Sequence, residues 1–186
     1  PEVVKILPVL NDDVFLEVDD KSSTCLLNLF NKCKVNALKF ATSNEENGIG
    51  IRGFLKTQPH LKSIYCRGSN ALELFYSYGN SYNENYQELP FRLEILMLRN
   101  VYMRSYYPDL FLPSAPHIRI LSLIDITPVS SHHVLASFID QCTNLNELTL
   151  QNCHLPSLKP SKSITKIILR QSTTSKWIVG MKKKKK

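Results

Sequence analysis

A glycine-rich stretch is the first feature of the sequence whose spacing could bind a ligand. Gly48, Gly50 and Gly53 occur in the order G-x-G-x-x-G, between an expected strand and an expected short helix. In dinucleotide-binding folds such glycines follow the strand directly, and an acidic residue lies about 20 positions further on. Here residues 43–47 intervene and Pro59 truncates the helix, since proline cannot continue a helix interior. We therefore favour a tight turn in a loop and keep a small α/β nucleotide-binding enzyme as an alternative.

The titratable side chains form no recognisable catalytic or metal-binding motif. His132 and His133 are adjacent at an expected helix start, where their side chains would point about 100° apart and could not chelate together. The cysteines are Cys25, Cys33, Cys66, Cys142 and Cys153. They include no C-x-x-C pair, so we expect reduced, mostly buried thiols in a cytoplasmic or nuclear protein. We accordingly expect no enzymatic activity, no cofactor and no metal.

Composition and charge indicate a globular protein with a nearly neutral body. The 186 residues are 43% hydrophobic and 21% charged, which is typical of a folded domain. The net charge is +7, but the lysine run at residues 182–186 supplies five of these charges and leaves two for the rest. This run resembles a solvated tail and lacks the aromatic context of a specific nucleic-acid site. The apolar runs are too short for a transmembrane helix, so we expect no membrane partner.

One segment defines the pattern that organises the rest of the sequence. Residues 145–155 read LNELTLQNCHL, which fits L-x-x-L-x-L-x-x-C-x-L and resembles the leucine-rich-repeat signature. Leu148 and Leu150, at positions 4 and 6, are two residues apart and face the same side of a strand. Cys153, at position 9, follows the strand, where its thiol can bond to backbone exposed by a bend. One such unit cannot bury its own apolar face, which predicts stacked neighbours.

Further copies of this pattern extend over most of the chain. They begin at Val35, Leu61, Leu93, Ile118, Leu145 and Ile164. The intervals are 26, 32, 25, 27 and 19 residues, and most fit the range of about 20–29 that such repeats show. The longest interval contains a tyrosine-rich polar insertion at residues 77–87. We therefore predict an α/β leucine-rich-repeat solenoid over residues 1–180, with about five or six irregular repeats, followed by a basic tail at residues 181–186.

Several connecting segments are expected to be helical. Residues 19–34, 51–57 and 130–141 place apolar side chains on one face. Between the third and fourth copies, Tyr107-Pro108 and Leu112-Pro113 disfavour a long helix and predict an extended or 3₁₀ segment. The first 13 residues contain a short apolar run that we interpret as the tail of a preceding repeat.

One segment resembles a particular family. Residues 132–155, HHVLASFIDQCTNLNELTLQNCHL, place a helix, Gln141-Cys142 and Asn144-Leu145 before L-x-x-L-x-L-x-x-C. This layout is similar to the cysteine-containing repeat of F-box/leucine-rich-repeat proteins and of ribonuclease-inhibitor-like arrays, although no F-box pattern occurs near the N-terminus. The resemblance implies the substrate-binding part of a cullin-type ubiquitin ligase receptor. The alternative is a leucine-rich-repeat scaffold, inhibitor or immune-receptor fragment unrelated to ubiquitination.

The candidate binding surface is the predicted concave face of the sheet. Its side chains come from positions 3, 5 and 7 of each copy. We expect the partner to contact Tyr65, Arg67, Ile95, Met97, Arg99, Ile120, Ile124, Gln151 and Arg170. An apolar centre with an aromatic residue and arginines at its border is typical of a protein-binding hot spot, unless a helix or loop covers it. We therefore predict non-catalytic recognition of a protein, by a monomer or by a component of a larger complex.

Overall fold

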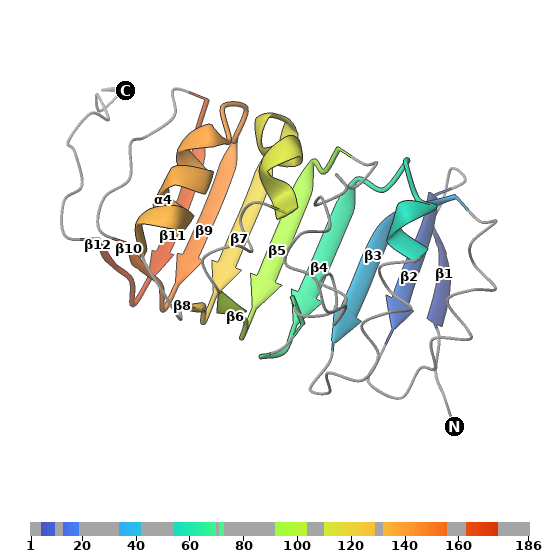
Figure 1. Cartoon of the computed structure of the whole chain (residues 1–186), viewed down its shortest axis with the longest axis horizontal. Helices are drawn as coiled ribbons and strands as arrows, with labels where there is room; N and C mark the ends of the chain where they lie inside the picture. The colour runs from blue at the N-terminus through green and yellow to red at the C-terminus, as the bar shows by residue number, and fades with distance from the viewer. Residues whose placement is uncertain are drawn as a thin grey trace, which may run out of the picture.

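The chain folds as an α/β protein with a largely parallel eight-stranded sheet (Figure 1). The computed structural model describes residues 5–9, 13–18, 34–41, 54–69, 71–72, 92–103, 110–128, 132–155 and 163–174. The strands are β1 (Lys5–Val9), β2 (Asp13–Val18), β3 (Val35–Ala41), β4 (Ser63–Arg67), β5 (Ile95–Arg99), β7 (Ile120–Ile124), β9 (Glu147–Gln151) and β11 (Lys166–Arg170). They lie side by side in chain order, and every neighbouring pair from β2 to β11 is parallel.

The pairing register aligns equivalent positions of the sequence copies. At position 4 the neighbours across the sheet are Leu38, Ile64, Leu96, Leu121, Leu148 and Ile167. At position 6 they are Phe40, Cys66, Leu98, Leu123, Leu150 and Leu169. From β3 to β9 both columns are buried and belong to one hydrophobic core. The alternation of side chains along a strand therefore sends positions 4 and 6 inward together, as the sequence pattern predicts.

A repeated bend follows the strands. The residue at position 8 has a positive φ in Asn100 (53°), Asp125 (54°), Asn152 (50°), Gln171 (49°) and Gly68 (122°). Glycine, asparagine and aspartate tolerate this left-handed conformation better than other residues. After the bend, short parallel strands pair between neighbouring copies: β6 (Tyr102–Met103) with β8 (Thr127–Pro128), and β10 (His154–Leu155) with β12 (Thr173–Thr174). The five copies from Leu61 to Ile164 thus share the left-handed residue of this bend.

In the last two copies, the side chain at position 9 stabilises this bend by hydrogen bonding to the backbone, whereas the two copies before them have Val101 and Ile126 at this position. The Cys153 thiol donates to the carbonyl oxygen of Gln151 at 3.2 Å, and it also lies 3.3 Å from that of Leu123. In the next copy, the Ser172 hydroxyl donates to Arg170 O at 3.1 Å and accepts from Cys153 N at 3.2 Å. The predicted role of the small polar or thiol side chain at this position is therefore confirmed.

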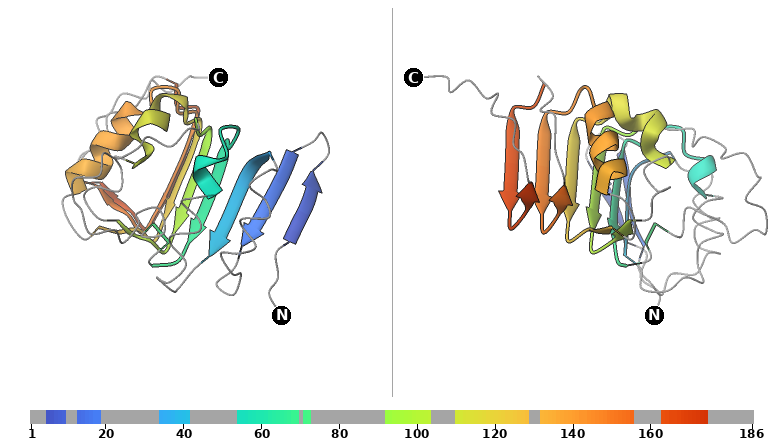
Figure 2. Two further views of the ribbon diagram at one scale, coloured as in Figure 1. Left: turned by 45° about the vertical axis from the view of Figure 1, so that its right-hand side comes forward. Right: turned by 60° about the vertical axis from the view of Figure 1, so that its left-hand side comes forward.

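The helical segments cover one face of the sheet (Figure 2). Helix α4 (His132–Gln141) confirms the helix predicted at residues 130–141, and Leu135, Phe138 and Ile139 join the core. The segment before Ile118 contains the 3₁₀ helix η3 (Leu112–His117), in agreement with its proline content. Residues 54–56 form a helical turn that buries Phe54 and Leu55 completely.

The N-terminal edge differs from the prediction. Strand β1 is antiparallel to β2, so residues 5–9 and 13–18 form a two-stranded unit at the edge of the sheet and not merely the tail of a repeat. The intervening sequence holds Asn11 and Asp12, residue types that favour turns. Other sequence predictions lie outside the described residues: the helix over 19–34 except for its last residue, the glycine-rich stretch at 48–53, the insertion at 77–87 and the tail at 181–186.

Candidate functional site

The sheet has one face that the described helices do not cover. We call it the open face and define it as positions 3, 5 and 7 of strands β3 to β11, which point away from the buried positions 4 and 6. Figure 2 shows α4 and η3 on the other side of the sheet. All nine residues predicted to contact a partner lie on the open face, because the register aligns their three columns across the strands.

The centre of the open face is apolar. Ile95 pairs in register with Ile120, and Arg99 pairs with Ile124. Met97 lies beside Ser122, which is only 7% exposed. Ile95, Met97, Ile120 and Ile124 are each partly exposed. Because neighbouring strands are about 4.8 Å apart, these side chains form a continuous apolar strip that keeps access to solvent.

Two arginines border this strip. Arg67 on β4 is in register with Arg99 on β5, and both side chains are exposed. Like charges directly opposite each other on a sheet are destabilising, and among the described residues neither arginine is in an ion pair. A carboxylate placed between them would relieve the repulsion and accept hydrogen bonds from both guanidinium groups. Tyr65, which is partly exposed on β4, lies beside Met97 on the adjacent strand β5.

The opposite border of the strip is polar. Glu147 on β9 is in register with Ile120, and its Oε2 accepts a hydrogen bond from Lys166 Nζ at 2.9 Å. Further along, Gln151 is partly exposed beside the exposed Arg170. The open face therefore has a small apolar centre and a charged rim, which is the general anatomy of a protein-binding surface.

The described cysteines are poor nucleophiles. Burial raises the pKa of the Cys66 thiol well above its usual range and that of Cys142 to about 12. Burial also raises the pKa of Cys153, against the lowering effect of backbone hydrogen bonds. All three thiols are free and buried, so they stay protonated near neutral pH and contribute to packing.

The histidines of α4 and of the segment after β9 lie on different elements. His133 is exposed on α4, and His154 begins β10, after the bend. Within the described residues, no group of three or more histidine, cysteine, aspartate or glutamate side chains is arranged to hold a metal ion.

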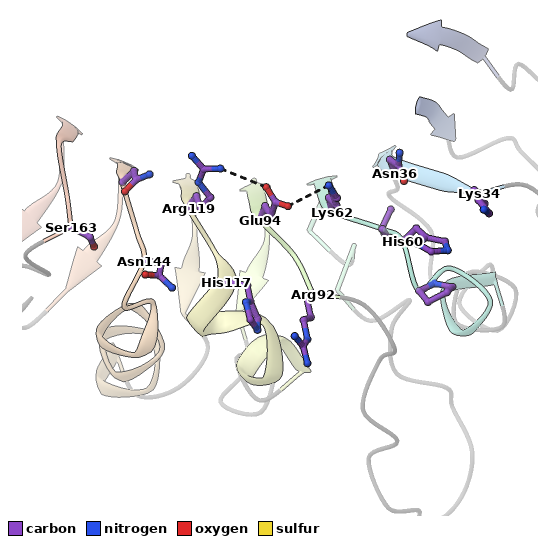
Figure 3. Close-up of a pocket in the computed structure, with 13 residues that line it drawn as sticks. Lys34, Asn36, His60, Lys62, Arg92, Glu94, His117, Arg119, Asn144 and Ser163 are labelled. Atoms are coloured by element: carbon purple, nitrogen blue, oxygen red, sulfur yellow. Dashed lines mark ion pairs between the residues drawn. The ribbon is translucent and has the colours of Figure 1, made fainter. Parts of the chain in front are cut away.

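The structure reveals a second surface that the sequence analysis missed. A groove of about 1040 Å³ runs along the N-terminal ends of the parallel strands, and we call it the edge groove (Figure 3). It is lined by Lys34, Asn36, Pro59, His60, Leu61, Lys62, Arg92, Glu94, His117, Arg119, Asn144, Asn146 and Ser163. Most of these residues stand at position 2 of a copy or immediately before the first residue of a copy. These positions lie outside the apolar signature. Aligning them across the copies would have revealed the recurring basic residues Lys34, Lys62, Arg92 and Arg119.

Comparison of the chain with protein-family models, curated proteins and solved structures finds no match. In the part of the chain that the structure describes, no helix combines the length and apolar character that crossing a membrane requires.

Proposed function

We propose that the chain is a leucine-rich-repeat solenoid whose open face recognises a protein partner without catalysis. Under this proposal the open face is the concave side of the array, and the apolar strip with Arg67 and Arg99 contacts the partner. We further propose that the partner is a substrate of an F-box-type ubiquitin ligase, for which this chain provides the binding repeats.

The solenoid proposal is supported by features that recur from copy to copy. Equivalent positions pair in register from β3 to β11, and the left-handed residue recurs at position 8. At that bend, the backbone N–H of Gly68, Asn100, Asp125 and Asn152 donates to the position-7 carbonyl of the next copy, at 2.8–3.1 Å. A unit that repeats its strand, its bend and its hydrogen bonds is what a stacked array requires.

The binding proposal depends mainly on one observation. Ile95, Met97, Ile120 and Ile124 keep partial exposure on a face that no described helix covers, beside two exposed arginines that form no ion pair with any described residue. Burying apolar area contributes most of the free energy of association, while a charged rim favours one partner over others. Conversely, a parallel strand whose second face served only to fill a core would bury these side chains.

The ligase proposal has narrower support. It comes from residues 132–155, where the structure shows a helix, a buried Cys142, a buried Leu145 and then strand β9. The Cys142 thiol donates to the carbonyl oxygen of Phe138 at 3.4 Å, so this cysteine satisfies a backbone acceptor in the last turn of α4. This is the layout on which the resemblance to F-box/leucine-rich-repeat proteins is based.

The test is a co-purification from cells that compares the parent chain with an Ile95→Asp/Ile120→Asp variant. Two new carboxylates in the apolar strip should remove a discrete partner, because a charge buried without a counter-ion opposes association. The matched control is Ser137→Asp/Gln141→Asp, which places the same charges on exposed positions of α4. All three proteins should show the same cooperative thermal transition by circular dichroism.

Two outcomes would contradict the proposal. If the open-face variant and the parent capture the same proteins, recognition does not use the open face. If the α4 control loses the partner equally, added negative charge is responsible and not the position. For the ligase step, the captured partner should become ubiquitinated when the protein is expressed at full length together with a cullin and its adaptor. A partner whose ubiquitination is unchanged would leave a scaffold or inhibitor role.

A further inference from the structure

The edge groove is a basic surface separate from the open face. Its lining includes the four cationic residues Lys34, Lys62, Arg92 and Arg119, with one carboxylate, Glu94. All four cations are exposed. They come from the starts of β3, β4, β5 and β7, which are successive strands. The sheet therefore converts residues that are far apart in the sequence into one continuous row of positive charge.

Ion pairing inside the groove neutralises only part of the positive charge of these four cations. Glu94 lies between Lys62 Nζ at 3.6 Å and Arg119 Nη1 at 3.9 Å, as Figure 3 shows. One carboxylate is thus shared by two cations, each with 61% of its side chain exposed. Within the described residues, neither Lys34 nor Arg92 is in an ion pair. The groove keeps a net positive charge in its own structure.

The backbone at this edge is already hydrogen-bonded. Glu94 N and Ile95 N both donate to the carbonyl oxygen of Lys62, at 2.8 and 3.0 Å. Arg119 N and Ile120 N donate in the same way to Glu94 O, at 2.8 and 3.1 Å. A ligand in the groove would therefore be recognised by side chains and would not add a strand through main-chain pairing.

We propose that the edge groove binds an extended acidic segment of a protein. From β3 to β11 the groove crosses five inter-strand spacings, or about 24 Å at about 4.8 Å each. An extended peptide of about seven residues has that length. Carboxylates on the peptide would pair with Arg92 and Lys34, and the guanidinium group can hold a carboxylate by two parallel hydrogen bonds.

The lining favours a peptide over a single-stranded nucleic acid. Sequence-independent binding of single strands combines basic residues with aromatic side chains on which the bases stack. The groove has no phenylalanine, tyrosine or tryptophan among its lining residues. The groove is also lined by Asn144 and Asn146. Asn144 Nδ2 already donates to Pro116 O at 2.6 Å, and the side-chain carbonyl oxygens of both residues can accept from a peptide N–H.

Two groove variants should change the affinity for an acidic peptide in opposite directions. The probe is a fluorescein-labelled peptide of five Glu-Ser units, measured by fluorescence anisotropy at about 50 mM salt, where exposed charges are weakly screened. Lys34→Gln/Arg92→Gln should weaken binding about fivefold, as expected for two exposed charge contacts. Glu94→Gln should strengthen binding about twofold, because it frees Lys62 and Arg119.

The control variant is Lys185→Gln/Lys186→Gln, which removes the same net charge from the C-terminal lysine run. Its affinity for the peptide should change much less than that of the groove variant. Equal losses in the two variants, or weaker binding by Glu94→Gln, would mean that the peptide senses only overall charge and would overturn the proposal. Tighter binding of a ten-nucleotide oligothymidine with the same dependence on Arg92 would overturn it in favour of a nucleic-acid site. Ile95 and Ile120 do not line the groove, and separate variants and separate probes test the two proposals, so each can fail without the other.

Discussion

Strands β9 and β11 are adjacent and carry the same signature positions, but they bury them differently. Leu148 and Leu150 on β9 are 2% and 0% exposed, whereas Leu169, which pairs with Leu150, is 40% exposed. Strand β9 has a sheet neighbour on each side, β7 and β11, while among the described strands β11 pairs within the sheet only with β9. Burial at a signature position is therefore supplied by the neighbouring copies. The proposed solenoid would behave in this way, because the stability of such an array is a sum over units and their interfaces.

The largest expected difference between the two strands comes from truncating their equivalent leucines. Leu150→Ala should lower the free energy of unfolding by about 3 kcal/mol, because it leaves a cavity in a closed part of the core. Leu169→Ala should lower it by about 1 kcal/mol or less, since much of that side chain already contacts water. Urea denaturation followed by circular dichroism measures both changes.

The same experiment can break the comparison. Equal losses for Leu150→Ala and Leu169→Ala would show that β11 is as well packed as β9 in solution. A changed denaturant slope in either variant would instead indicate that one end of the array unfolds separately. The matched Leu148→Ala variant should resemble Leu150→Ala, because both leucines are fully buried.

A second prediction concerns the effect of alkaline pH on stability through the thiol of Cys142, which follows α4. Burial raises the pKa of Cys142 to about 12, from 9.0 for an ordinary thiol. The unfolded chain therefore loses this proton first, and the contribution to stability is present below pH 9 and declines between pH 9 and 12. At pH 11, two units above the ordinary pKa, the loss should approach about 3 kcal/mol, since one pKa unit corresponds to about 1.4 kcal/mol.

Tyrosines and lysines also ionise in this range, so the control is the difference between the parent and Cys142→Ala. The stability of the alanine variant should fall less steeply between pH 9 and 11. Parallel profiles would mean that the Cys142 thiolate is solvated in the folded protein and that the α4–β9 junction is open to water.

Two serines sharpen the comparison at the level of single hydrogen bonds. The Ser114 hydroxyl accepts from Leu93 N at 3.1 Å in a buried setting, and the Ser172 hydroxyl accepts from Cys153 N at 3.2 Å where burial is partial. Ser114→Ala should cost about 2 kcal/mol, because it strands a buried N–H group. Ser172→Ala should cost about half as much, since water can replace the hydroxyl. Urea denaturation of the two alanine variants measures both costs. Glycine variants would not serve as controls, because they also change backbone entropy. Equal costs would contradict the difference in burial.

The sequence was informative wherever a local pattern controls the structure. The alignment of Leu148 with Leu121 and Ile167 follows from alternation along each strand, and the bend at Cys153 follows from its position after the strand. The β1–β2 pairing was missed because Asp13–Val18, DVFLEV, lies outside the repeated signature. The edge groove was missed because Lys34, Lys62 and Arg92 come to one edge of the sheet only when successive strands pair. The exposure of Leu169 could not be read from its position either, since it depends on what adjoins β11.

The smallest expected effect concerns the ion pair that links β9 and β11 on the open face. Glu147 and Lys166 are in register, with Nζ and Oε2 2.9 Å apart, but their side chains are 41% and 56% exposed. Water screens this attraction, so we expect a coupling of about 0.3–0.5 kcal/mol in a double-mutant cycle of Glu147→Ala and Lys166→Ala. The coupling should shrink further at high salt. A value above about 1 kcal/mol would mean that the pair is held rigidly and that electrostatics fasten β11 to the sheet. A small value leaves backbone pairing and the partial burial of Ile167 as the forces that hold β11, in contrast to the closed leucine core beneath β9.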